Sequence, residues 1–89
     1  MFLNTQSTKQ QIINKLQQDL SPTFLEVIDE SYMHEKHFDA AKGGETHFKV
    51  RISSFCFDNV TRIEAHRIIN KLLIYELSNG VHALSIEII

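Results

Sequence analysis

The sequence contains a single cysteine, Cys56, together with one proline and three glycines. One cysteine cannot form an intramolecular disulfide, which fits a reducing compartment. The scarcity of proline and glycine argues against long disordered linkers. There is no run of about 18 apolar residues, and the start, MFLNTQSTKQQ, lacks the charged and apolar regions of a signal peptide. These absences predict a cytoplasmic protein that does not enter a membrane.

An excess of charge of one sign is also absent. Nine lysines and arginines oppose eleven aspartates and glutamates, so the net charge is -2 with neutral histidines, and the basic residues form no dense cluster. Bulk charge therefore does not indicate a nucleic-acid binder. No nucleophile and base pattern, phosphate-cradling glycine loop or paired-carboxylate motif is recognisable, so we do not expect an enzyme. The length predicts one domain, residues 1–89, with a small core.

Apolar residues recur at helical spacing in two segments. The first segment runs to Leu20, and either Ser7 with Gln10 or Thr8 with Gln11 can form a capping box at its start. This helix should end before Pro22, because proline disfavours helical geometry in the preceding residue.

The second segment predicts one long helix that starts after Thr61 and continues to Ser78. Glu64 completes a capping box with Thr61, and Asn79-Gly80 supplies a left-handed stop. The helix is predicted to contribute one apolar stripe to the core.

Three segments are predicted as strands: 23–30, 46–53 and the apolar C-terminal stretch GVHALSIEII. In the second strand, Phe48, Val50 and Ile52 should point to a buried face and the intervening residues to a wet face. The first two strands should be antiparallel. The helix between the second and third strands forms a βαβ unit, so these two strands should be parallel. The third strand then starts beside the start of the second, where the long connection 31–44 also ends.

Five histidines are candidates for chemistry at or near this end of the sheet. Strand alternation places His82 on the buried face with Leu84, Ile86 and Ile88, where it either packs and bonds to a carbonyl or serves as a metal ligand. In the connection, His34 and His37 have metal-compatible spacing. Without a second cysteine they make a poor structural zinc site, but they would form a half-site that thiolates from another molecule complete. The wet face should carry His47 as a surface residue. On the long helix, His66 should be a solvated or packing residue. Cys56 lies between two phenylalanines and should be a buried small hydrophobe.

Three stretches, SPTFLEVIDESYMH, GGETHFKVRIS and AHRIINKLLIYELSNGVHALSI, together resemble the BolA family over nearly the whole chain. The resemblance implies an α+β fold of order αββααβ, similar to class II KH domains, with a three-stranded mixed sheet and helices packed on one face. Members of this family partner monothiol glutaredoxins and share a glutathione-dependent [2Fe-2S] cluster with them. Some members are also described as transcriptional regulators in stress and cell-shape control.

The resemblance also assigns residue roles. The C-terminal ligand histidine of the family corresponds to His82, and the loop ligand corresponds to His34, with His37 as the alternative. Glutaredoxin and glutathione would supply the thiolates, so no cluster is expected in the isolated protein. The implied function is that of an adaptor in iron–sulfur handling and redox regulation.

The alternative function is DNA-binding transcriptional regulation, which the KH-like fold suggests. KH domains clamp the nucleic-acid backbone with a GxxG loop between two helices. The corresponding segment here, FDNVT, has no glycine, and Gly43-Gly44 lies between strands instead. Weak, salt-dependent binding of DNA is therefore the most that this sequence predicts. The candidate residues for it are Lys49, Arg51, Arg62, Arg67 and Lys71.

Overall fold

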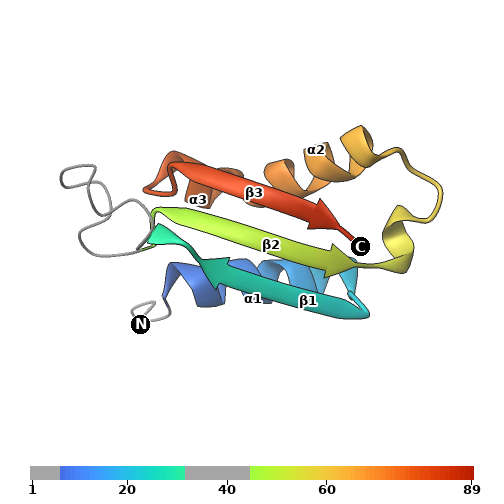
Figure 1. The fold of residues 1–89 in the computed structure, drawn as a ribbon, viewed down its shortest axis with the longest axis horizontal. Helices are drawn as coiled ribbons and strands as arrows, with labels where there is room; N and C mark the ends of the chain where they lie inside the picture. Colours follow the sequence, from blue (N-terminus) through green and yellow to red (C-terminus); the bar gives the residue numbers. More distant parts are fainter. Residues whose placement is uncertain (1–6, 32–44) are drawn as a thin grey trace, which may run out of the picture.

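The computed structural model of the chain describes residues 7–31 and 45–89. The candidate ligands His34 and His37 lie outside these described residues. In chain order the elements are α1 (Thr8–Leu20), β1 (Phe24–Asp29), β2 (His47–Ser53), the short 3-10 helix η3 (Phe55–Phe57), α2 (Arg62–Leu72), α3 (Ile74–Ser78) and β3 (Ala83–Ile88). The predicted αββααβ order is confirmed (Figure 1).

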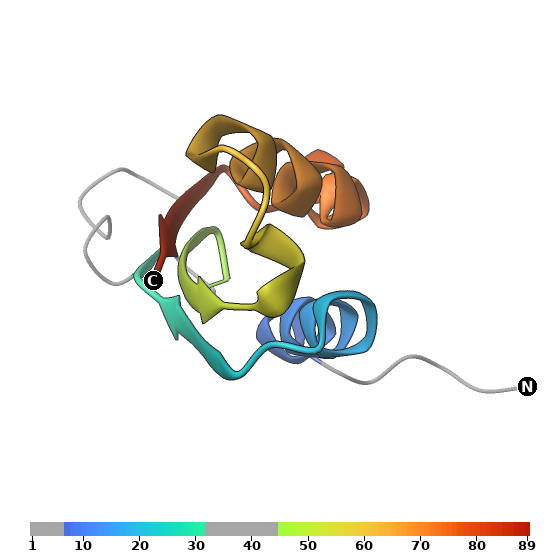
Figure 2. The ribbon, with the colours of Figure 1, turned by 90° about the vertical axis from the view of Figure 1, so that its right-hand side faces the viewer.

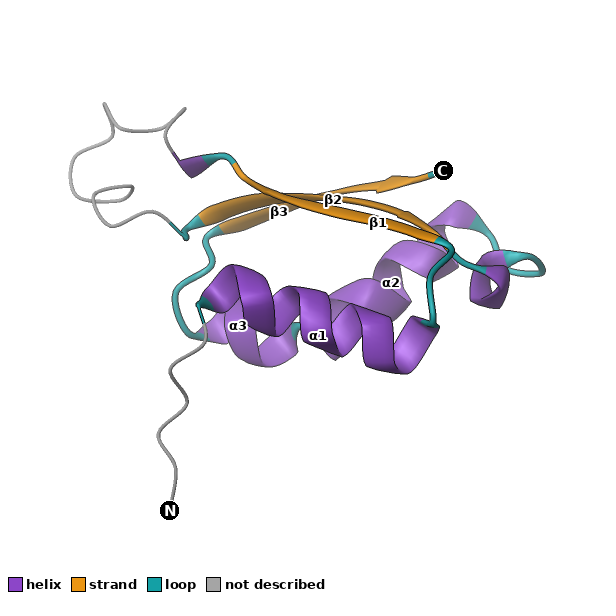
Figure 3. Cartoon of the chain, turned by 90° about the horizontal axis from the view of Figure 1, so that it is seen from below, coloured by secondary structure: helices purple, strands orange, loops and turns teal. Residues whose placement is uncertain are grey.

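The strands form one mixed sheet in the order β1-β2-β3. β1 pairs antiparallel with β2, with Val27 opposite Val50, and β3 pairs parallel with β2, with Ile86 opposite Val50. The helices α1, α2 and α3 lie on one side of the sheet, and no helix of the described residues covers its other face (Figures 2 and 3). Both strand directions and the one-sided covering agree with the sequence-based prediction. Because β2 and β3 are parallel, their starts lie side by side.

The core lies between the sheet and this helical layer. The central strand β2 alternates as predicted: Phe48, Val50 and Ile52 are buried, while the residues between them are half-buried. Burying each side chain of this size stabilises the fold by about 1.5–3 kcal/mol. The helices and the remaining elements complete the core with Ile12, Leu16, Leu20, Val27, Phe57, Ala65, Ile69, Leu73 and Val81.

The start of α2 is capped as predicted, whereas the start of α1 lacks the predicted capping box. Thr61 and Glu64 form the reciprocal capping box expected at the start of α2. At the start of α1, the Ser7 hydroxyl accepts a hydrogen bond from the Gln10 amide at 3.1 Å, but the Gln10 side chain donates to Asn14 instead of returning to the cap. The first helix therefore has a one-way serine cap.

The prediction of one long second helix was wrong, because α2 and α3 are separated at Leu73. The backbone of Leu73 leaves helical geometry, with φ -102° and ψ 20°, while its side chain remains 1% exposed in the core. The predicted glycine stop after α3 is confirmed: Gly80 has φ 131°, a conformation that strains any residue with a Cβ. Within 7–31 and 45–89, no helix has the length and apolar character to cross a bilayer.

The prediction that Cys56 is buried was also wrong. Residues 55–57 form a 3-10 turn, in which Phe57 is buried, whereas Phe55 and Cys56 are exposed. The hydroxyl of Ser54 fixes this turn by accepting from the Cys56 amide and by donating to the carbonyl of Leu20 at 2.6 Å. Only one of the three side chains can face the core because a 3-10 helix has three residues per turn.

A buried ion pair connects α1 to α3. The side chain of Glu76 is 2% exposed, and Lys15 Nζ lies 3.0 Å from its Oε1 and 2.9 Å from its Oε2. Only Oε1 lies in a hydrogen-bonding direction, so Oε2 is stabilised by the ion pair alone. The ammonium also lies over the ring of Tyr75, 5.5 Å from its centre. The backbone carbonyl of Glu76 accepts a hydrogen bond from the Val81 amide, so the ion pair and this hydrogen bond together fix the turn that leads into β3.

We expect Lys15→Met to lower the free energy of unfolding by about 1–3 kcal/mol, because it leaves a buried carboxylate without its counter-charge. The cost is below that of a fully buried pair because Lys15 is partly exposed. Urea denaturation measures the change, and Lys71→Met on the exposed face of α2 serves as the matched control. The double variant Lys15→Met/Glu76→Gln should recover much of the loss. Equal stability of Lys15→Met and the control would contradict this role of the pair.

Candidate functional site

The starts of β2 and β3 are joined through one residue, Thr46. Its carbonyl oxygen accepts the amide of His82 at 2.7 Å and the amide of Ala83 at 3.3 Å. Ala83 is the first residue of β3, so the His82 amide makes its contact with Thr46 just before the strand begins. The backbone at His82 is thereby held to the first residues of the central strand.

The predicted placement of His82 on the buried face of the sheet was wrong. The alternation seen at Leu84 and Ile86 would place His82 on the buried face, but His82 and Ala83 are both exposed, and Val81 is buried, 4% exposed. The prediction failed because strand alternation was extended to His82, whereas β3 begins at Ala83. Val81 occupies the core in place of the imidazole, which avoids burying a polar ring without partners.

The ring of His82 lies beside the ring of His47, with centroids 6.0 Å apart and planes inclined by 35°. His47 starts β2 and is half-buried, and its Nδ1 lies 2.9 Å from the hydroxyl of Thr46. The sequence predicts His47 as a surface residue on the wet face; it is half-buried there and lies beside the candidate ligand His82. The pair lies on the sheet face opposite the helices.

The end of β1 supports the same site from the other side. The buried hydroxyl of Ser31 accepts the amides of Thr46 and His47 at 2.8 and 3.1 Å. The carboxylate of Asp29 accepts the amides of Ser31 and Glu45 at 2.9 and 3.0 Å. Burial alone would raise the pKa of Asp29, but the hydrogen bonds from Ser31 and Glu45 and the charge of Lys9 outweigh it and lower this pKa. The charged carboxylate of Asp29 therefore holds the backbone at Ser31 next to the backbone at Glu45.

Neither of the loop candidates, His34 and His37, lies among the described residues. The described residues that flank them, Ser31 and Glu45, are at the His82 end of the sheet. Cys56 follows the opposite end of β2, about 20 Å away at the rise of an extended strand. Among described residues, no group of three or more histidine, cysteine or acidic side chains could hold a metal. The described part of this site thus offers imidazole nitrogens and no thiolate.

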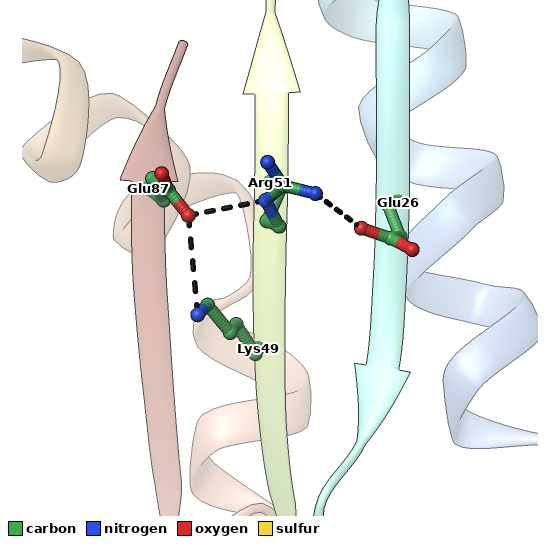
Figure 4. A network of polar contacts seen from close by, with 4 residues as sticks. All are labelled: Glu26, Lys49, Arg51 and Glu87. Atoms are coloured by element: carbon green, nitrogen blue, oxygen red, sulfur yellow. Dashed lines mark hydrogen bonds and ion pairs between the residues drawn. The ribbon is translucent and has the colours of Figure 1, made fainter.

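The open sheet face carries an ion-pair network beside this site. Arg51 donates to Glu26 at 2.9 Å and to Glu87 at 3.1 Å, and Lys49 lies 3.9 Å from Glu87. Figure 4 shows these side chains in front of the sheet, with the helices behind it. The hydrogen bonds that Arg51 donates to Glu26 and Glu87 raise the pKa of Arg51 above its usual value. Two of the five candidate nucleic-acid contacts are therefore already paired with carboxylates.

The other three candidates, Arg62, Arg67 and Lys71, are exposed on α2. This helix belongs to the layer that covers the buried face of the sheet (Figure 3). The five basic residues therefore lie in two groups on different faces of the molecule and do not form one patch. His66 also lies on α2, in this helical layer.

Sequence reasoning missed the polar residues that position the histidines: Ser31, Thr46 and Asp29. Their role depends on contacts between strand ends, which no local pattern encodes. One signal for the orientation of His82 was present, because unbroken alternation would have exposed the apolar Val81 instead.

Comparisons with known proteins identify the family of this chain. The family model described as BolA-like protein matches residues 16–89. A BolA-like protein of Dictyostelium discoideum is 47% identical over 72 residues, which are 80% of this chain and 60% of that protein. The DNA-binding transcriptional regulator BolA of Vibrio cholerae is 41% identical over 76 residues, 85% of this chain and 68% of that protein.

Among solved structures, the BolA domain of SufE1 from Arabidopsis thaliana superposes with a TM-score of 0.83 at 42% identity. The match covers 96% of this chain and 93% of that domain. The family-model match extends from the middle of α1 through β3 and so includes His47 and His82. The chain therefore belongs to the BolA-like protein family.

Proposed function

We propose that this chain is a non-enzymatic cytoplasmic adaptor that docks a monothiol glutaredoxin and contributes imidazole ligands to a glutathione-dependent [2Fe-2S] cluster shared between the two proteins. The observation that supports this proposal most strongly is the placement of His82. Its ring is exposed on the open sheet face, while its amide is fixed by the Thr46 carbonyl. A ligand on a rigid strand start has its position set before a partner arrives.

The donor chemistry of the described residues fits a shared cluster. Imidazole replaces thiolate on one iron in a known class of [2Fe-2S] centre, so histidine is a competent ligand. The described residues place no thiolate at this end of the sheet, because Cys56 follows the far end of β2. The remaining ligands would then come from the glutaredoxin cysteine and glutathione. When bound, the cluster would be able to accept an electron or to be transferred to another protein. His82 would hold it from this chain, together with His34 or, alternatively, His37.

We expect His82→Ala to change or abolish the visible absorption and circular dichroism of the cluster formed with a monothiol glutaredoxin, glutathione, iron and sulfide. The fold should be unaffected, because the side chain is exposed and the amide that binds Thr46 is retained. His66→Ala, on α2, is the matched control and should leave the spectrum unchanged. His34→Ala and His37→Ala should each have a milder effect than their combination.

Pull-down of glutaredoxin by the same variants separates docking from ligation. His82→Ala protein that still captures the apo-glutaredoxin but gives an altered spectrum supports the proposal. An unaltered spectrum with His82→Ala would show that this histidine does not bind the cluster. Failure of the wild-type chain to capture any monothiol glutaredoxin would reject the adaptor role itself.

DNA-binding regulation is the second candidate, because related BolA proteins carry the name DNA-binding transcriptional regulator. The residues that favour it are the exposed cations of α2, whereas Lys49 and Arg51 are paired with carboxylates on the sheet. Contacts from lysine and arginine to phosphates carry no base information. This arrangement supports weak binding that is nearly blind to sequence.

Fluorescence anisotropy with duplex DNA should give an affinity that falls as the salt concentration rises. For three phosphate contacts, the slope of log K against the logarithm of the salt concentration should be about -3. Arg67→Ala and Lys71→Ala should each reduce the slope by about 1. Lys49→Ala is the control and should have little effect. Sequence-selective binding that is insensitive to salt would make DNA recognition the leading function.

A further inference from the structure

The strand β3 forms an edge of the sheet, with β2 on one side and no strand of the described residues on the other (Figure 1). We propose that this edge pairs with the β3 edge of a second copy of the chain, antiparallel and about a two-fold axis, so that two three-stranded sheets join into one. A two-fold contact of this kind uses the same surface on both copies. The paired segment contains none of the candidate cluster ligands, so the inference does not rest on the proposed function.

Alternate residues of β3 direct their backbone groups away from β2. The amides of Ala83 and Ile89 donate to carbonyls of residues 46 and 52, on the side of β2. Because these directions alternate along a strand, the odd-numbered residues of β3 bond to β2, and the even-numbered residues present their N–H and C=O groups outward. The outward residues are Leu84, Ile86 and Ile88. A row of such groups is a template for pairing with another strand.

The same three residues make this edge apolar on the side of the core. Leu84, Ile86 and Ile88 pack against the core but are only partly buried. Protein edges are commonly protected by lysine, proline or inward-pointing charges, and β3 contains none of these. Its one charged residue, Glu87, lies on the open face and is bound by Arg51. An identical strand alongside would therefore cover apolar side chains of both copies.

The two-fold symmetry and the direction of the backbone groups select one register. Outward-pointing residues must oppose one another, and an axis at Ile86 pairs Ile86 with its copy and Leu84 with Ile88. All the outward residues of β3 then take part, which gives about six hydrogen bonds. An axis at Ser85 would instead bring Ile88 opposite His82, whose amide already donates to a carbonyl.

This register also suits the open face of the joined sheet. It places Ser85 opposite Glu87 of the second copy, so that the two glutamates do not oppose each other. Ser85 is exposed, and its hydroxyl is able to donate to the facing carboxylate. Opposite charges on facing residues stabilise a strand pair, whereas like charges destabilise it. A single strand pair is a small interface, so we expect a weak and reversible dimer.

The test is sedimentation equilibrium of the full chain over a range of concentrations, with a reductant that prevents disulfides through Cys56. We expect a monomer–dimer equilibrium that Ser85→Lys strengthens and Ser85→Glu weakens, each by about three- to tenfold. The effects on the monomer should be opposite, because Lys49 lies beside position 85 in the pairing of β2 with β3. Changes in monomer stability therefore cannot produce this result. Ser53→Glu, on the central strand, is the matched control and should dimerise as the wild type does.

Hydrogen exchange measured by NMR locates the interface. The amides of Leu84, Ile86 and Ile88 should gain protection as the concentration rises, whereas those of Ser85 and Glu87 should be protected at every concentration. A chain that is monomeric at millimolar concentration, or a dimer that neither substitution at position 85 affects, would overturn the proposal. Protection of the three outward amides only when a monothiol glutaredoxin is added would assign the edge to that protein and would also overturn pairing with a second copy.

Discussion

The carbonyl of Thr46 accepts two successive amide protons from the start of β3, and the candidate site depends on this contact. It lies just before β3 begins at Ala83, where Val81 enters the core and His82 faces the open side of the sheet. The same residue contacts His47 through its hydroxyl. One residue thus determines where both imidazoles lie, while Ser31 holds that residue to the end of β1.

The distribution of charge separates this end of the sheet from the rest of the open face. Further along the strands, Arg51 lies between Glu26 and Glu87, so that cations and anions neutralise one another there (Figure 4). Such exposed pairs contribute little to stability, but they keep an uncovered sheet face polar. The imidazoles of His47 and His82 lie at the strand starts, beside Ser31 and Glu45. The proposed glutaredoxin would then approach this end of the sheet rather than the middle of the face.

The sequence was sufficient for the topology because its signals were periodic and long. The alternation around Val50 and the capping box at Thr61 predicted β2 and the start of α2, and the crossover helix predicted a parallel β3. Alternation misplaced His82 because β3 begins only at Ala83, and the contact that holds the His82 backbone comes from Thr46, next to the neighbouring strand. The exposure of Cys56 was missed for a similar reason: a 3-10 turn fixed by Ser54 chooses which of three side chains enters the core. Local patterns thus predicted the elements, whereas contacts between elements set the site.

The central claim is that the Thr46 contact just before β3 holds His82 away from the core and beside His47, and nuclear Overhauser effects test it most directly. In the isolated chain we predict cross-peaks between the imidazole protons of His82 and His47, together with slow hydrogen exchange at the amides of His82 and Ala83, which Thr46 binds. Cross-peaks from the His82 ring to the core-facing methyl groups of Leu84 and Ile86, with none to His47, would contradict the account.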